Sequence, residues 1–253
     1  YVDIELDRAG LSGWDQLAAR VRENGGTVIR SHHEPRYTPA DLPGLMARFS
    51  SDTQEIPKLA VMAQSTKDTL ALIASAREFG KLMPGKRGIW IAMGDYGAIT
   101  RARPSLTNSV LTYTSHAGDE PAAPGHISAQ VLRDVYRVGE VSAGWPSFAV
   151  IGNPVAHSRS PEYHNTRFQN DRMDAVYLPL KTDDLEELIA AADPLNLLGA
   201  SVTVPHKEAA LRLANGSGAV AASESVRVCG AANTIWRDED GEWRADNTDV
   251  EAF

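Results

Sequence analysis

Apolar and polar positions alternate along the chain in a regular series of short and long segments. Short runs rich in apolar and β-branched residues, typical of strands, occupy residues 1–6, 26–31, 56–62, 87–93 and 109–114. Apolar residues at helical spacing fill the stretches between them, most clearly at 13–24 and 65–80. Because strands and helices alternate at intervals of roughly 30 residues, the first half predicts a parallel β-sheet, as in a (β/α)8 barrel.

The second half resumes this alternation after a break. A helix predicted at 127–137 closes the first unit, and the Gly, Ser and Pro residues of 139–146 indicate a linker. Beyond it, predicted strands at 147–153, 175–180 and 199–204 alternate with helices at 160–170 and 182–193, for which Ser160 and Thr182 are N-cap candidates. The pattern predicts an α/β chain with two domains, 1–138 and 147–253.

Composition and charge argue against several classes of binding partner and of site. The net charge of −8 over 253 residues argues against a general affinity for nucleic acid or an anionic membrane. No run approaches the roughly 18 apolar residues that a membrane span needs. The single cysteine, Cys229, excludes an internal disulfide and a thiolate metal cluster, and it indicates a reducing compartment. Because the histidines lack metal-ligand spacing with carboxylates or thiols, we expect no metal site.

The first residues, "YVDIEL", read as a strand. They carry neither a methionine nor the charged and apolar regions of a targeting peptide, so no such segment is visible. Since a domain seldom begins abruptly on a strand, we expect the chain to be part of a longer protein.

Lys58 stands inside the apolar run "IPKLAVMA", where an isolated ammonium is unfavourable. Its side chain has three interpretations: it extends to the surface, it pairs with a carboxylate, or it is a desolvated amine nucleophile. The preceding strand ends in "RSHHEPRYTP", so in a parallel sheet His32 or His33 would lie beside Lys58, in a geometry suited to proton transfer during imine chemistry. A surface or core role for these histidines stays open.

Five blocks of the first half carry a family resemblance. In order, "VDIEL", "IRSHHEPRYTP", "IPKLAVMAQSTKDTLALI", "WIAMGDYGAITRARP" and "AAPGHIS" resemble type I 3-dehydroquinate dehydratase, a (β/α)8 barrel of the shikimate pathway. The resemblance implies that Lys58 forms an imine with the substrate ketone and that His33 is the general acid and base. It also implies that Arg101 binds the substrate carboxylate, a task that suits a guanidinium group.

The resemblance has two departures. Ala122 and His126 stand where the family has a serine or alanine and a glutamine, and His126 can donate only one hydrogen bond where glutamine offers two donors and an acceptor. The family's first three strands would precede Tyr1. Five strands of eight cannot close a barrel, so the fold class that we predict for the first domain is the C-terminal part of a (β/α)8 barrel.

The second half contains polar groups at the ends of its predicted strands. Ser158 and Ser160 stand at a predicted helix N-terminus, where hydroxyls suit a carboxylate or a polyol, although capping alone also explains them. Lys207 follows a strand and a proline, and Asn233 and Asp249 follow two short strands around the "RDEDGEW" hairpin. Each of these features is also compatible with simple turn chemistry.

Taken together, "GNPVAHSRSP", "SVTVPHK", "GAANT" and "DNTD" resemble the substrate-binding domain of shikimate dehydrogenase, an α/β domain. The resemblance implies a catalytic pair, Lys207 and Asp249, in which the lysine gives a proton to the carbonyl oxygen. It assigns the hydrogen bonds to the substrate to five residues: Ser158, Ser160, Thr203, Asn233 and Asp249.

NADP is the cofactor that this second family implies. The only G-x-G-x-x-[GA] match, "GSGAVA" at 216–221, follows a helical segment instead of a strand and therefore lacks the context of a dinucleotide fingerprint. In the family the NADP domain follows the "NTD" block, so we expect no cofactor-binding residue within this chain.

The two resemblances lead to one hypothesis: a bifunctional enzyme that converts 3-dehydroquinate to 3-dehydroshikimate and then to shikimate, in the cytoplasm or, in a plant, a plastid. The alternatives are a catabolic quinate/shikimate dehydrogenase, a non-catalytic substrate-binding fragment, and another imine-forming barrel such as a class I aldolase, which would leave the second half unexplained.

Overall fold

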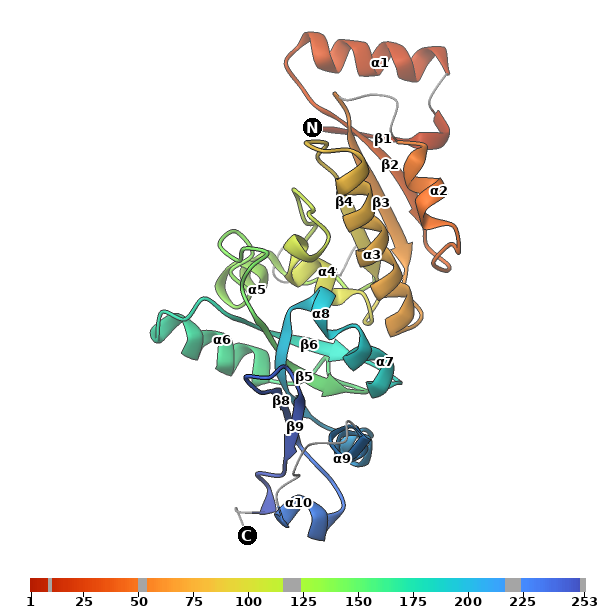
Figure 1. Cartoon of the computed structure of the whole chain (residues 1–253). Coiled ribbons are helices and arrows are strands. Elements are labelled where there is room, and N and C mark those ends of the chain that lie inside the picture. The colour runs from red at the N-terminus through yellow and green to blue at the C-terminus, as the bar shows by residue number, and fades with distance from the viewer. Residues whose placement is uncertain (9–10, 50–53, 116–123, 217–223, 251–253) are drawn as a thin grey trace. The chain divides into compact units, whose positions relative to one another are not determined.

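The structure is a computed structural model that describes the chain except for residues 9–10, 50–53, 116–123, 217–223 and 251–253 (Figure 1). The chain forms two compact units. Unit 1 comprises Tyr1–Gln64 and Asp68–Ser128, and unit 2 comprises Ser65–Lys67 and Ala129–Phe253. The predicted domain boundary near residue 138 stays a prediction, because helix α5 (Ala129–Asp134) groups with unit 2.

Unit 1 contains a four-stranded, fully parallel sheet in the order β1-β2-β3-β4 (Figure 1). Its helices follow the strands in the predicted alternation. The elements are β1 (Val2–Glu5), η1 (Leu6–Arg8), α1 (Ser12–Glu23), β2 (Val28–Glu34), α2 (Leu42–Ala47), β3 (Ile56–Met62), α3 (Thr66–Leu82), β4 (Ile89–Met93), α4 (Ala98–Ala102) and η2 (Pro104–Leu106).

The two faces of this sheet differ in what they contact. One face packs on the helices: Leu59, Val61 and Trp90 form a core with the buried side chains of α2 and α3, and Ile4 and Val28 pack against α1. The opposite face carries a second apolar cluster that includes Ile29, Ile56, Ala60 and Ile91, against which Val110, Leu111 and Tyr113 pack. Side chains alternate between these faces along each strand, so odd-numbered positions of β2 and even-numbered positions of β3 share the second face.

The predicted strand at 109–114 is wrong. This segment forms only an isolated bridge, Gly88 to Ser109, and then runs as irregular chain across the apolar cluster of the second face. Its apolar residues are partly buried by packing on the sheet, and beyond the bond from the Val110 amide to the Gly88 carbonyl the segment does not continue as a strand. The predicted helix at 127–137 is also shorter than expected, since α5 ends at Asp134.

Unit 2 contains a five-stranded mixed sheet in the order β6-β5-β7-β8-β9. The first three of these strands are parallel, and β8 and β9 are antiparallel additions at one edge. Besides α5, the elements are β5 (Ser147–Gly152), α6 (Ser160–Asn170), β6 (Val176–Lys181), α7 (Leu185–Ala190), α8 (Ala192–Leu195), β7 (Leu197–Val202), α9 (Lys207–Gly216), α10 (Glu224–Cys229), β8 (Thr234–Arg237) and β9 (Trp243–Asp246).

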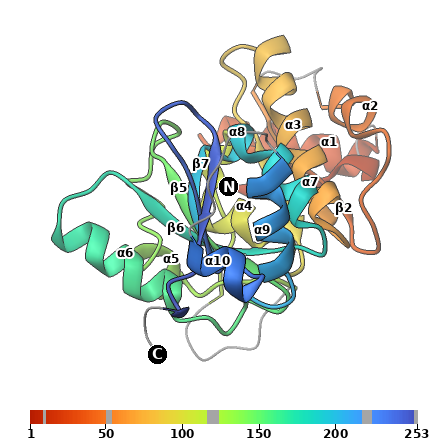
Figure 2. The same cartoon turned by 60° about the horizontal axis from the view of Figure 1, so that its bottom comes forward.

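Helices cover both faces of this sheet (Figure 2). Helix α6 lies on one face, where Phe168 packs with Phe148, Val150 and Tyr177. Helices α7, α8 and α9 lie on the other, over buried side chains of four neighbouring strands: Ala149, Ile151, Leu178, Leu180, Ala200, Val202 and Ile235. This layered arrangement places the carboxyl ends of β5 and β7 side by side.

Both predicted helix caps of unit 2 are wrong. Ser160 is the first helical residue of α6 and Arg159 precedes it, without a capping side-chain hydrogen bond. Helix α7 begins at Leu185, and the side chain of Asp184 accepts the capping hydrogen bond from the Glu187 amide. Thr182 is buried before the helix, where its hydroxyl bonds the backbone of Asp184. At α7 the cap is therefore Asp184, the residue directly before the first helical residue.

No helix among the described residues combines the length and the apolar character that crossing a membrane would require.

Candidate functional site

Lys58 lies in the middle of β3 on the sheet face opposite the helices, and it is only 6% exposed. Its Nζ donates to Asp3 Oδ2 of β1 at 2.8 Å. The same atom lies 4.0 Å from the centre of the Tyr113 ring. Of the three interpretations of this lysine, the structure therefore contains the carboxylate pair.

Of the two adjacent histidines, His33 shares the face of Lys58. It stands opposite Ala60, two residues beyond Lys58 along the sheet, whereas His32 stands opposite Leu59 on the helix-covered face. The His33 Nδ1 pairs with Glu5 Oε1. Because Glu5 binds one ring nitrogen, it orients the imidazole and leaves Nε2 for another group.

Arg101 contacts the segment that carries Tyr113, and His126 lies within reach of the charge of Arg101. Arg101 of α4 is buried, and its Nη1 donates to the Tyr113 carbonyl at 3.3 Å. Burial lowers the pKa of Arg101 to about 10, and the group remains a cation at neutral pH. Burial and then the charge of Arg101 lower the pKa of His126, so His126 is neutral near pH 7. Arg101 Nε and His126 Nδ1 have no hydrogen-bond partner within the described parts of the chain. Ala122 lies outside the described residues.

Sequence reasoning missed Asp3 and Tyr113. Asp3 had a signal, because strand alternation puts Asp3 and Glu5 of "VDIEL" on one face, where each binds one of the two predicted catalytic groups. Tyr113 had none, because its segment was predicted to be a strand and its position depends on how that irregular chain packs.

In unit 2, the predicted residues gather at one edge of the sheet. The loops after β5 and β7 meet there, where the Asn153 amide donates to the Val204 carbonyl. A Cβ on Gly152 would come within 2.4 Å of the Thr203 Cγ2, so this close approach depends on glycine. The antiparallel pairing brings the start of β8 and the end of β9 to the same edge.

Lys207 and Asp249 form an ion pair at this edge. Lys207 begins α9, and its Nζ donates to Asp249 Oδ2 at 2.8 Å. Their side chains are 36% and 57% exposed, so the pair is open to solvent. The pKa of Asp249 lies below its ordinary value mainly because Lys207 donates a hydrogen bond to the carboxylate, and a hydrogen bond from Asn233 lowers it further. The site thus contains a carboxylate that stays ionised and a lysine that it holds.

The loop after β9 is built by Asn233 and Asn247. Asn233 Oδ1 accepts from the Thr248 amide at 3.0 Å. The buried Asn247 accepts from the Asp249 amide through Oδ1 and donates to the Ala231 carbonyl through Nδ2. These bonds fix the backbone that carries Asp249. Asn247 was not among the predicted residues, although it stands inside the quoted "DNTD" block.

The predicted hydroxyls lie near the same edge. Ser158 Oγ accepts from the Ser160 amide at 3.2 Å at the start of α6. Thr203 follows β7, and its amide donates to the Ile151 carbonyl. Lys207 and Asp249 are joined directly by a hydrogen bond, whereas Ser158, Ser160 and Thr203 are brought to this edge by the loops that carry them.

The described residues do not fit a dinucleotide cofactor. Gly152, the last residue of β5, is in close contact with the chain's own Thr203 and Val204, which leaves no cradle for a pyrophosphate. The "GSGAVA" stretch follows a helix, since α9 ends at Gly216, and the remainder of it is outside the described residues. Within the described ranges, no three His, Cys, Asp or Glu side chains come together as metal ligands would.

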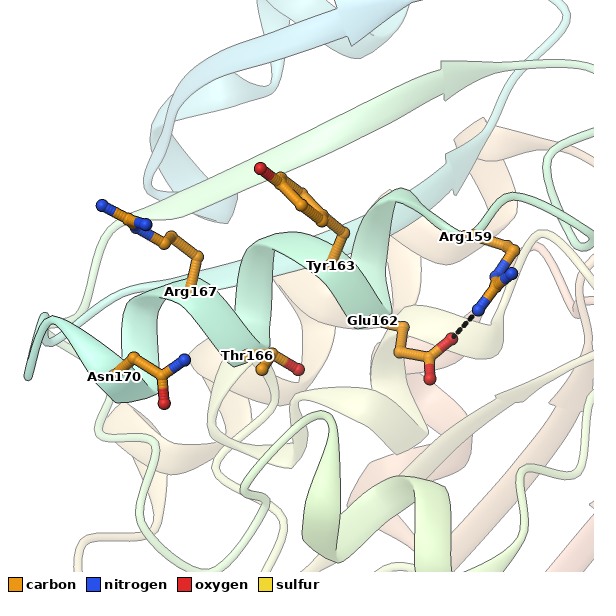
Figure 3. A pocket seen from close by; sticks show the side chains of 6 residues that line it. All are labelled: Arg159, Glu162, Tyr163, Thr166, Arg167 and Asn170. Carbon is orange, nitrogen blue, oxygen red and sulfur yellow. Dashed lines mark ion pairs between the residues drawn. The ribbon is translucent and has the colours of Figure 1, made fainter.

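A cavity of about 630 Å³ lies elsewhere, on the outer face of α6 (Figure 3). It is lined by residues of this one helix, including Tyr163 and Thr166, and by the Arg159 and Glu162 ion pair at 3.6 Å. None of the predicted site residues lines it. This hollow is thus separate from the sheet edge that carries Lys207 and Asp249.

Two family models match the chain. Residues 1–142 match type I 3-dehydroquinase, and residues 150–235 match the shikimate dehydrogenase substrate binding domain.

Relatives with both parts are similar over 98% of the chain. The bifunctional 3-dehydroquinate dehydratase/shikimate dehydrogenase, chloroplastic, of Arabidopsis thaliana is 31% identical over 254 residues, and the chain spans 40% of its length. The pentafunctional AROM polypeptide of Yarrowia lipolytica is 30% identical, and the chain spans 16% of its length. The chain thus spans less than half of either curated relative.

Among solved structures, the dehydroquinate dehydratase and shikimate dehydrogenase from S. pombe AroM has a TM-score of 0.43 at 26% identity, covering 98% of this chain and 46% of that one. The 3-dehydroquinate dehydratase of Geobacillus kaustophilus HTA426 has a TM-score of 0.47 at 29% identity, covering 54% of this chain and 52% of that one.

The assignment rests on the sequence matches. The first model covers more than half of the 253 residues, and the second covers most of the sheet of unit 2. The chain belongs to the type I 3-dehydroquinase family, with a shikimate dehydrogenase substrate binding domain after it.

Proposed function

We propose that the chain carries two consecutive activities of the shikimate pathway: dehydration of 3-dehydroquinate through an imine on Lys58, and NADPH-dependent reduction of 3-dehydroshikimate to shikimate at Lys207 and Asp249. The observation that carries the first is the buried Lys58 amine, which shares a sheet face with His33 and is linked through Tyr113 to Arg101. The second is supported by the Lys207 and Asp249 pair at the strand edge.

Lys58 must lose a proton before its nitrogen attacks a ketone carbon, and Asp3, 2.8 Å away, is the nearest acceptor. The new C–N bond forms as the carbonyl oxygen takes one proton, which gives a carbinolamine. Its hydroxyl then takes a second proton and leaves as water, and because the nitrogen has given up one of its own protons, a protonated imine remains. This cation is an electron sink that acidifies the neighbouring carbon. Asp3 then faces a positively charged nitrogen again, so the same carboxylate stabilises the reactant lysine and the imine.

His33 is the proposed acid and base of this reaction. Its ring nitrogen outside the Glu5 pair removes the proton from the carbon beside the imine and returns a proton to the departing hydroxyl. Glu5 stabilises the imidazolium that forms between these steps. Arg101 binds the substrate carboxylate, and the neutral His126 offers one hydrogen bond beside it.

In unit 2, Lys207 gives a proton to the substrate's carbonyl oxygen, and Asp249 holds the lysine in place. The side chains of Ser158, Ser160, Thr203 and Asn233 bind the substrate's carboxylate and hydroxyls. NADPH supplies the hydride when it is bound, and we assign no described residue to it. The compartment, cytoplasm or plastid, remains a prediction.

Trapping tests the imine directly. Borohydride added with 3-dehydroquinate should reduce the imine and leave a stable adduct on Lys58, which peptide mapping by mass spectrometry would locate. Lys58→Met should abolish this adduct. Lys81→Met, which removes an exposed lysine paired with Glu78, is the matched control and should retain it. Folded wild-type protein with an unmodified Lys58 would exclude imine catalysis and favour a non-catalytic binding role.

Shikimate binding tests the second site without cofactor. Calorimetry should detect shikimate binding to the wild-type chain. In Asp249→Ala the affinity should fall about tenfold or more, because the carboxylate that bonds a substrate hydroxyl and holds Lys207 in place is removed. The control is Asp240→Ala in the exposed hairpin, which should bind normally. Unchanged affinity in Asp249→Ala would contradict its assignment, and preferential binding of quinate would favour the catabolic alternative.

The ion pair at this edge predicts a pH response. The pKa of Asp249 lies below its ordinary value because Lys207 bonds the ionised form, so the pair is complete at neutral pH and is lost as the pH falls through that pKa. In Lys207→Met the pKa of Asp249, measured by carboxyl NMR, should rise toward 3.8. Asp238 is an internal control whose pKa should not change in this variant. Burial raises the pKa of Asp238, but hydrogen bonds from the Glu242 amide and from Arg244, and not from Lys207, hold it below its ordinary value. A pKa of Asp249 that does not change would mean that Lys207 is not its partner in solution.

A further inference from the structure

Lys58 reaches its carboxylate partner across a whole strand. The bond joins Lys58 on β3 to Asp3 on β1, and β2 lies between them. Neighbouring strands are about 4.8 Å apart, so the backbones of β1 and β3 are separated by roughly 10 Å. The lysine side chain therefore extends over β2 instead of standing above its own strand.

The register shows which residue of β2 lies in its path. Ser31 stands directly opposite Lys58 on one side and opposite Glu5 on the other. Asp3 stands opposite Ile29, one step earlier on the same face. The lysine side chain consequently crosses β2 between Ile29 and Ser31. Ser31 is 1% exposed, and within the described parts of the chain its Oγ has no hydrogen-bond partner.

A hydroxyl buried in this way is unfavourable for the fold. A polar group that gives up water without gaining a partner lowers stability, and alanine, which has nearly the same shape, would avoid the loss. Ser147 in β5 provides the contrast: it is equally buried, at 1% exposure, but its Oγ donates to the Leu195 carbonyl at 2.8 Å. The Ser31 hydroxyl therefore serves an arrangement other than the Lys58 and Asp3 pair.

We propose that Ser31 is a positioning residue for the imine-forming lysine, an inference that rests on the proposed dehydratase function. When the nitrogen leaves Asp3 to bond the substrate carbon, it moves back toward β3, over Ser31. There the Ser31 Oγ accepts a hydrogen bond from the N–H of the attached nitrogen and holds it in line with the ketone carbon. Ser31 makes and breaks no covalent bond and transfers no proton.

If Ser31 has this role, its hydroxyl contributes to the rate of imine formation and not to the stability of the fold. Two serine variants test both quantities. In Ser31→Ala the thermal midpoint should stay the same or rise, because no hydrogen bond of the resting protein is lost. The maximal rate of borohydride trapping with 3-dehydroquinate should fall about tenfold, because one hydrogen bond to a charged group is lost. The concentration of 3-dehydroquinate that gives half of this maximal rate should not change. The matched control, Ser147→Ala, should lower the thermal midpoint and leave trapping unchanged.

Three results would overturn the proposal while leaving the dehydratase function intact. In the first, Ser31→Ala is trapped at the wild-type rate. In the second, Ser31→Ala loses thermal midpoint and trapping rate together, as an ordinary structural serine would. In the third, the half-saturating concentration of 3-dehydroquinate rises while the maximal trapping rate is unchanged, which would place the hydroxyl against the substrate. If the wild-type protein traps nothing at Lys58, the proposed function fails, and the role of Ser31 fails with it.

Discussion

The ion pair between Lys58 and Asp3 is the interaction on which the site of unit 1 depends. A buried ammonium without a partner is strongly unfavourable, and the pair joins two strands that are not neighbours in the sheet. Asp3 is 35% exposed on its side chain, so the carboxylate keeps part of its hydration while it holds the lysine. The parallel register then sets the remaining positions: Ser31 between the two strands, and Glu5 with His33 one step further along the same face.

The two lysines of the proposed sites differ in environment, and the difference matches the chemistry that we propose for each. Lys58 is enclosed by a sheet face, an aromatic ring and a carboxylate, where water does not compete with a substrate for the amine. Lys207 is partly exposed at the start of α9, where its ammonium is open to solvent and to an incoming substrate oxygen. Each lysine has an aspartate at 2.8 Å, so pairing alone does not distinguish a nucleophile from an acid. Burial and the neighbouring groups do.

Much of this arrangement could be predicted from the sequence. The apolar run of β3 was located to the residue, and the alternation of strands and helices gave the parallel sheet, because both depend on local patterns of side chains. The position of Lys207 beyond β7 was equally accessible, since the carboxyl ends of parallel strands share an edge. The prediction that Asn233 follows a strand is wrong: Asn233 precedes β8, and the antiparallel pairing of β8 with β9 brings it to the edge that Asp249 reaches after β9.

What the sequence did not yield depends on contacts between distant segments. The 109–114 stretch has a strand-like pattern but packs as irregular chain, and only that packing brings Tyr113 to Lys58. Asp3 is an ordinary polar position until the register shows it on the face of Lys58. The N-cap predictions failed for a local reason, a shift of one or two residues in the helix start. At α7 the cap is Asp184 instead of Thr182, and at α6 Ser160 is already helical, so no side chain caps that helix.

A double-mutant cycle between Asp3 and Lys58 tests the central claim most directly. Urea unfolding of unit 1 would be measured for the wild type, Asp3→Asn, Lys58→Met and the double variant. If the carboxylate compensates the buried ammonium, Asp3→Asn should lower the free energy of unfolding by about 1–3 kcal/mol. The loss of unfolding free energy in the double variant should then be smaller than the sum of the two single losses by at least about 1 kcal/mol. Single effects that add within about 0.5 kcal/mol would contradict the claim that Asp3 holds Lys58 in the folded protein.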